Sequence, residues 1–170
     1  DDPQVPPGPN RIATKKIEEA QERWGGFDYE YWEVDGRGHG APPGGYDALL
    51  DKVIEARRNT RPERIVWQPT LSWKQDFYWL RWEAPEKYTT LVVDLDKAKN
   101  EVRIEADGVP LHGFSLYFDE DMVDLDEEVV VIVEDEEVFR GVLEPSLDAL
   151  LSSAGRGDSG YLFSHRVHLD

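Results

Sequence analysis

The sequence after Pro62 contains many short apolar runs separated by turn residues, and this feature constrains the fold most strongly. Short runs rich in β-branched and aromatic residues, separated by Gly, Asp, Asn and Pro, are typical of strands joined by turns. Many such strands at close spacing favour a sandwich or a barrel. We therefore expect strands at residues 64–68, 77–83, 88–96, 101–106, 113–118, 128–134, 138–144 and 160–169.

One short helix is expected to interrupt these strands. Pro145 stands near its expected first turn and Gly155 lies beyond its expected end, and both residues are favoured at those helix positions. Leu147, Leu150 and Leu151 have the spacing of a single helix face.

The first part of the chain has a different pattern, so we expect two domains, residues 1–60 and residues 61–170. Apolar residues recur near the helical period from Ile12 to Trp24, and Gly25-Gly26 provides the stop. The aromatic-rich run Phe27 to Val34 predicts a strand, since its residues partly alternate. A second helix is predicted from an apolar face made of Tyr46, Leu49, Leu50, Val53 and Ile54.

Charge and composition exclude several function classes. The chain has 36 acidic residues against 19 Lys and Arg, and it lacks the clustered basic residues that bind phosphates, so neither nucleic acid nor an anionic membrane is an expected partner. It has no cysteine, which rules out disulfides and thiolate chemistry. The acidic residues at 119–128 do not have the spacing of an EF-hand loop, so a solvated connection is favoured over a calcium site. No metal or other cofactor is expected.

The candidate catalytic residues are Asp2 and His39. Asp2 begins the run Asp-Pro-Gln-Val-Pro, and His39 lies in a Gly-His-Gly sequence that follows the predicted strand. If a helix crosses back over a sheet between these points, both residues lie at the carboxyl ends of strands. There Asp2 could accept the Nδ1–H of His39 and stabilise the imidazolium formed during proton transfer.

The order of these elements resembles the end of the α/β-hydrolase superfamily, which includes serine esterases and prolyl-oligopeptidase-like hydrolases. The resemblance covers residues 1–59: an acid in the pattern D-x-x-V-P, a helix, a strand, G-x-G-H-G and an amphipathic helix. It implies that these residues are the carboxyl-terminal segment of an α/β-hydrolase, followed by a mainly antiparallel β-sandwich-like domain. It also implies that Asp2 and His39 belong to a Ser-His-Asp triad that cleaves ester or amide bonds.

The nucleophile of that triad is not expected within these residues. The near matches to G-x-S-x-G, at residues 113–117 and 157–161, differ from the motif and lie after the His instead of before the acid. The resemblance therefore implies a Ser on a missing upstream segment and a chain that is inactive alone. We expect that upstream segment, or another polypeptide, to pack on residues 1–59, because a lone strand with two helices leaves apolar faces and sheet edges uncovered.

The later residues resemble, more loosely, the β-rich extension of some bacterial α/β-hydrolases. The phrases that carry this resemblance are residues 76–80, 100–104 and 114–126. It implies an accessory domain without catalytic residues of its own.

An alternative from another class is a non-catalytic β-sandwich module that binds a ligand or a protein. Its contact surface would be the aromatic residues Trp67, Trp73, Trp79 and Trp82. Aromatic side chains bury large areas, so core packing is favoured over an exposed stacking platform.

Overall fold

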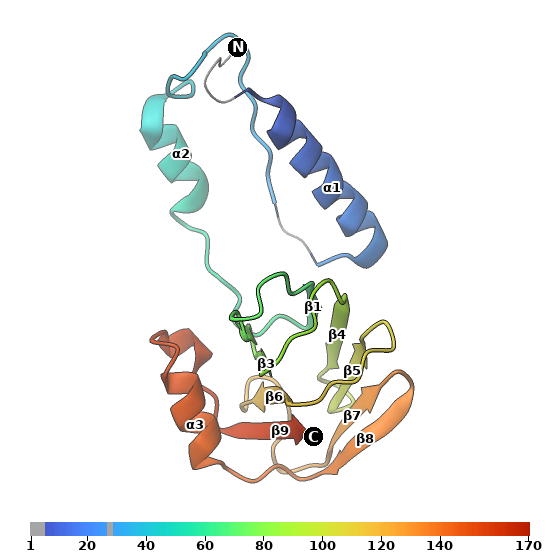
Figure 1. Cartoon of the computed structure of the whole chain (residues 1–170). Helices are drawn as coiled ribbons and strands as arrows, with labels where there is room; N and C mark the ends of the chain where they lie inside the picture. Colours follow the sequence, from blue (N-terminus) through green and yellow to red (C-terminus); the bar gives the residue numbers. More distant parts are fainter. Residues whose placement is uncertain (1–5, 27–28) are drawn as a thin grey trace. The chain divides into compact units, whose positions relative to one another are not determined.

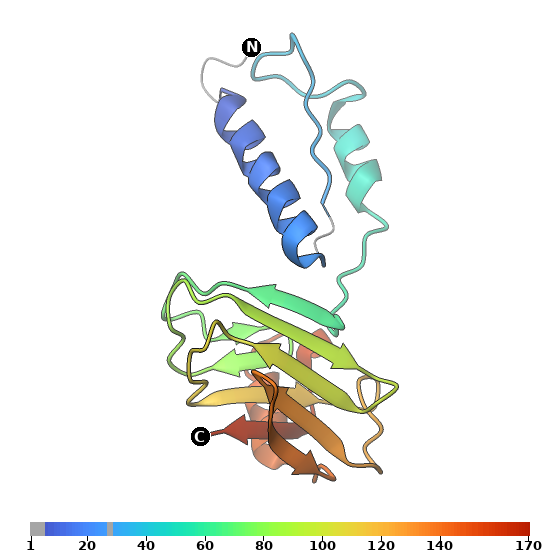
Figure 2. The same cartoon turned by 90° about the vertical axis from the view of Figure 1, so that its right-hand side faces the viewer.

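The computed structural model describes residues 6–26 and 29–170. The chain divides into two compact units, residues 1–58 and residues 59–170. Figures 1 and 2 show the helices of the first unit and the sheets of the second.

The first unit contains two helices, α1 (Gly8–Trp24) and α2 (Gly45–Val53). Pro9 lies in the first turn of α1, where its missing N–H leaves no intrahelical hydrogen bond unmade. Gly25 ends this helix with a φ of +69°. Gly44 precedes α2 with a φ of +85°, and a Cβ built there would lie 2.9 Å from the Cβ of Ala48. A side chain at residue 44 would therefore be both strained and crowded.

The α/β-hydrolase fold expected for residues 1–59 is wrong. The strand predicted at 27–34 is not formed over its described residues 29–34, which are extended but belong to neither sheet. A strand needs a neighbour for its backbone hydrogen bonds, and no described residue supplies one. The described chain is a mixed α/β protein with nine strands in two sheets, all after residue 59, and three short helices.

The second unit is the β-rich part of the molecule. Its five-stranded sheet has the order β1-β4-β5-β7-β8, and its four-stranded sheet has the order β2-β3-β6-β9. Neighbouring strands are antiparallel, except that β5 and β7 are parallel. The strands are β1 (Arg64–Trp67), β2 (Asp76–Phe77), β3 (Leu80–Trp82), β4 (Leu91–Asp96), β5 (Glu101–Glu105), β6 (Phe114–Phe118), β7 (Val129–Val133), β8 (Glu136–Gly141) and β9 (His165–Leu169).

The two sheets share one hydrophobic core. Trp67 of the five-stranded sheet meets Trp82 of the four-stranded sheet edge to face, with ring centroids 6.4 Å apart. Trp82 in turn contacts Phe114 in the same manner at 6.0 Å. Trp79 is also fully buried. Three of the four tryptophans considered as a stacking platform are therefore core residues.

One predicted strand is in fact a hairpin. The sequence pattern predicts a single strand over 77–83, but β2 and β3 pair with each other through Phe77 and Leu80. The chain reverses at Tyr78, which has a φ of +53°. A tyrosine at positive φ is strained and gives no turn signal in the sequence. The carbonyl of Tyr78 accepts a hydrogen bond from Arg156, which holds the turn in place.

Helix α3 (Leu147–Ala154) packs with its small residues inward. Its buried residues are Ala149 and Ser153, whereas Leu147 and Leu151 are exposed. The hydroxyl of Ser153 accepts a hydrogen bond from the N–H of Phe163 at 3.0 Å, which fixes this side of the helix toward the chain before β9. Ser146 caps the helix by accepting the N–H of Ala149.

Candidate functional site

His39 lies on an exposed turn of the first unit, between Gly38 and Gly40. Gly38 has a φ of +57°, and the N–H of Gly40 bonds to the carbonyl of Arg37 at 3.3 Å. The turn therefore presents the imidazole on the surface of the unit. Asp2, the predicted acid, lies outside the described residues, so its pairing with His39 stays a prediction.

The segment before this turn is held between the two helices. On one side, Glu33 accepts hydrogen bonds from Arg11 of α1, with Nε 2.9 Å from Oε2, and from the hydroxyl of Tyr31 at 2.6 Å. These hydrogen bonds, that of Arg11 first, lower the pKa of Glu33 to about 2. On the other side, Lys52 of α2 pairs with Glu30. Ion pairs and hydrogen bonds thus fix the path of the chain toward His39.

The described part of the first unit has no buried residue. The five apolar residues of the predicted α2 face are all exposed, from Leu49 at 40% to Tyr46 at 72%. On α1, Ile12 is 62% exposed. A helix normally owes most of its stability to packing of its apolar face, so these helices have surfaces that the described chain leaves uncovered.

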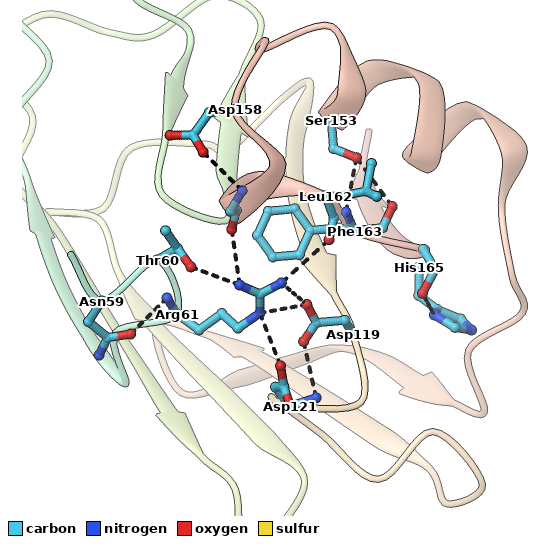
Figure 3. A network of polar contacts seen from close by, with 12 residues as sticks. Asn59, Thr60, Arg61, Asp119, Asp121, Ser153, Asp158, Leu162, Phe163 and His165 are labelled. Atoms are coloured by element: carbon cyan, nitrogen blue, oxygen red, sulfur yellow. Dashed lines mark hydrogen bonds and ion pairs between the residues drawn. The ribbon is translucent and has the colours of Figure 1, made fainter. Parts of the chain in front are cut away.

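The second unit contains a polar network centred on Arg61 (Figure 3). The guanidinium of Arg61 bonds to Asp119, with Nε 2.6 Å from Oδ2, and to the carbonyl of Gly160 at 3.0 Å. It also lies over the ring of Phe163, 5.1 Å from its centroid. These contacts join three segments that are distant in sequence. The positive charge of Arg61 is paired with Asp119 within the unit, so the network holds these segments together.

Two hollows border this network along the acidic loop. One has a volume of about 360 Å³ and is lined by residues that include Arg61, Asp119 and Ser164. The other, of about 580 Å³, is lined by residues 120–126 and Lys97. Within the described residues no group of three or more acidic or His side chains is placed to hold a metal ion. The carboxylate of Asp119 is instead engaged by Arg61 and by the N–H of Asp121.

A Ser-His-Asp contact that sequence reasoning missed lies on the four-stranded sheet. Ser115 Oγ is 2.9 Å from Nδ1 of His168, and Nε2 of His168 is 3.4 Å from Asp170. Only the pairing of β6 with β9 brings Ser115 and His168 together, so no spacing in the sequence could reveal it. Ser115 is 1% exposed in the middle of a strand. A substrate carbonyl could not reach it, so we assign these residues no catalytic role.

The sequence Arg156-Gly157-Asp158 matches an adhesion tripeptide, but its two charged side chains make contacts within the unit. Arg156 stacks against Tyr117 and Tyr161, with centroid distances of 5.4 and 5.6 Å, and bonds to Asp76 at 2.9 Å. Asp158 accepts the N–H of Gly160. Both charged side chains are engaged within the unit.

The loop between β1 and β2 carries the one exposed residue of the four tryptophans considered. Trp73 is 76% exposed, and Leu71 is 45% exposed. The loop borders a hollow of about 260 Å³ whose lining includes Trp67, Phe77 and Lys74. Trp73 itself is not among the residues that line this hollow.

Comparisons with protein families, with curated proteins and with solved structures found no match for this chain. A search of the described residues found no helix that combines the length and the apolarity needed to span a membrane.

Proposed function

We propose that this chain is the carboxyl-terminal portion of a serine hydrolase that cleaves ester or amide bonds. His39 acts as general base, Asp2 orients it, and the nucleophilic Ser belongs to a segment outside these residues. The observation that supports the proposal best is the exposed position of His39 on a glycine-flanked turn, directly after a segment anchored to two helices.

The chemistry assigned to His39 needs an imidazole that can meet a nucleophile on another segment. The Ser Oγ attacks the substrate carbonyl carbon while His39 takes the hydroxyl proton and passes it to the leaving alcohol or amine. Water then attacks the acyl-enzyme, and His39 accepts its proton and returns it to the Ser. Asp2 accepts the Nδ1–H and stabilises the imidazolium in both steps.

The second unit acts as an accessory domain in this proposal. Arg61 pairs with Asp119 and Arg156 pairs with Asp76 within the unit, and Ser115 is closed off from substrate. These features support a role in shaping access to the site or in association, without a reaction of its own.

A serine-directed fluorophosphonate tests the proposal on the full-length parent protein that the proposal requires. We expect covalent labelling of a Ser outside these residues and a loss of at least about a hundredfold in labelling rate for His39→Ala. His112→Ala is the matched control, since His112 is an exposed histidine of the second unit. Absence of labelling, or equal labelling of both variants, would contradict the proposal.

A second candidate, a ligand-binding module, is favoured by the exposed Trp73. The exposed indole of Trp73 gives a ligand a large, rigid apolar contact area with a polar N–H. Titration with soluble oligosaccharides or extended peptides should change the tryptophan fluorescence, and Trp73→Ala should remove the change. Persistence of the change in Trp73→Ala, or no change in the wild type, counts against this candidate.

A further inference from the structure

Two loops of the second unit are bound to each other where β1 ends and β4 begins. The loop after β1 covers residues 68–75, and the loop before β4 covers residues 83–90. The N–H of Tyr88 bonds to the carbonyl of Pro69 at 2.9 Å. The side-chain amide of Gln68 donates to the carbonyl of Tyr88 at 3.2 Å. The two loops therefore form one surface.

Two aromatic side chains project from this surface. Trp73 is 76% exposed and Tyr88 is 70% exposed. Within the part of the chain that the structure describes, neither ring contacts another ring, and neither the Nε1–H of Trp73 nor the hydroxyl of Tyr88 has a hydrogen-bond partner. Both rings are therefore open to a ligand.

The backbone of Tyr88 is strained, and packing of its side chain does not explain the strain. Its φ is +69°, a region in which a bulky side chain is a genuine outlier. Tyr78 is also at positive φ, but Arg156 bonds to its carbonyl. The Tyr88 ring is instead exposed. Backbone strain is concentrated at functional sites, so the position of this ring favours a role in binding.

The chemistry of the surface indicates the class of ligand. The two loops contain two Lys and two Glu and thus carry no net charge, whereas the whole chain carries −17 and repels anions. A neutral ligand fits best. The faces of a pyranose ring carry C–H groups, which suit the electron-rich face of an aromatic ring. Its hydroxyls can bond to the exposed hydroxyls of Thr70 and Ser72.

We propose that loops 68–75 and 83–90 bind a neutral polysaccharide, with sugar rings stacked on Trp73 and Tyr88. The inference rests on the second candidate function, a ligand-binding module, and names its ligand; it is independent of the hydrolase proposal. A proline-rich peptide fits less well, because such peptides dock in grooves lined by aromatic rings. The hollow beside these loops is lined by neither Trp73 nor Tyr88.

Calorimetric titration of the 170-residue chain tests the inference. The probes are four neutral hexasaccharides: cellohexaose, xylohexaose, mannohexaose and maltohexaose. We expect at least one to bind, and Trp73→Ala to weaken its binding at least about fivefold, because a stacked ring is lost. Tyr88→Asn should weaken binding to a similar extent without lowering the unfolding midpoint, since Asn tolerates positive φ better than Tyr. The matched control is Tyr46→Ala, which removes an equally exposed tyrosine of the first unit and should bind like the wild type.

Several outcomes would overturn the inference. These are no binding of any hexasaccharide up to about 10 mM, unchanged binding in Trp73→Ala or in Tyr88→Asn, or an equal loss in Tyr46→Ala. A lower unfolding midpoint for Tyr88→Asn would also overturn it, because the ring would then support the fold. Binding of capped decaproline in place of the sugars would keep the ligand-binding candidate and overturn the polysaccharide assignment. None of these results bears on fluorophosphonate labelling, so failure here is distinguishable from failure of the hydrolase proposal.

Discussion

The Nε atom of Arg61 lies 2.6 Å from the carboxylate of Asp119, 58 residues away in sequence. Both side chains are largely buried, at 20% and 13% exposure, and the guanidinium also covers the ring of Phe163. This contact ties the start of the second unit to the loop after β6 and to the chain before β9.

Replacing Arg61 with Met should therefore destabilise the second unit markedly. The change leaves Asp119 without its cation and the Gly160 carbonyl without its donor, and we expect a loss of about 2–4 kcal/mol in the free energy of unfolding. The measurement is a urea titration followed by tryptophan fluorescence. The matched control is Arg64→Met, because Arg64 and Asp94 form an exposed pair for which we expect a loss of at most about 1 kcal/mol. Equal losses in the two variants would contradict the anchoring role.

Ser153→Ala should also be costly. Ser153 Oγ accepts the N–H of Phe163, and its one proton is shared between the carbonyl oxygens of Leu150 at 3.1 Å and Phe163 at 3.2 Å. Ser153 and Phe163 are both buried, so removal of the hydroxyl leaves the Phe163 N–H unsatisfied at a cost of about 1–3 kcal/mol. Ser152→Ala, on the same helix but not buried, should change the unfolding midpoint little. A Ser153→Ala variant as stable as the Ser152→Ala variant would show that water replaces the hydroxyl.

Asp135→Gly should stabilise the hairpin of β7 and β8. Val133 pairs with Glu136, so the turn has two residues, Glu134 and Asp135, with φ values of +48° and +66°. Such a turn favours Gly at its second position. Gly relieves the strain of a positive φ, but it also makes the unfolded chain more flexible. The net effect should be an increase of about 0.5–1 kcal/mol in the free energy of unfolding. Thermal unfolding of the two proteins measures the change, and a lower midpoint for Asp135→Gly would contradict the turn assignment.

His165 should make the second unit less stable in mild acid. Burial lowers the pKa of His165 below its ordinary value of 6.5, while Glu144 and Asp119 oppose this shift. The unfolded chain therefore takes up a proton more readily than the folded chain. Stability due to the neutral imidazole is present above pH 6.5 and falls as the pH decreases through the folded-state pKa. His165→Gln should lose part of this pH dependence between pH 7 and 5, and parallel stability curves would refute the assignment.

The sequence predicted the second unit better than the first. Strands β4 and β5 contain β-branched residues and are followed by residues that favour turns. Asp107 and Gly108, which follow β5, adopt the positive φ values of a turn. The hairpin at Tyr78 was missed because its turn is held by a long-range bond from Arg156, and local patterns do not contain such contacts. The contact of Ser115 with His168 was missed for the same reason.

The spacing of residues in the sequence could not show what the helices and the extended segment of the first unit pack against. The apolar pattern of α2 predicted the helix, but the residues of its apolar face are 40% to 72% exposed in the described structure. The pattern of residues 27–34 predicted a strand, yet a strand exists only where a neighbour accepts its backbone bonds. An apolar pattern identifies the residues that a segment could bury. In the described part of the first unit, none of these residues is buried.

The proposed function depends on one physical claim, that residues 6–26 and 29–58 bury no core of their own and need another polypeptide to cover them. Calorimetry of the isolated chain tests this claim most directly, since the heat capacity change of unfolding reflects the surface that folding buries. If only residues 59–170 form a core, the change should be about 1.3–1.7 kcal/mol/K. A value of about 2.0–2.6 kcal/mol/K, expected when all 170 residues contribute, would contradict the claim.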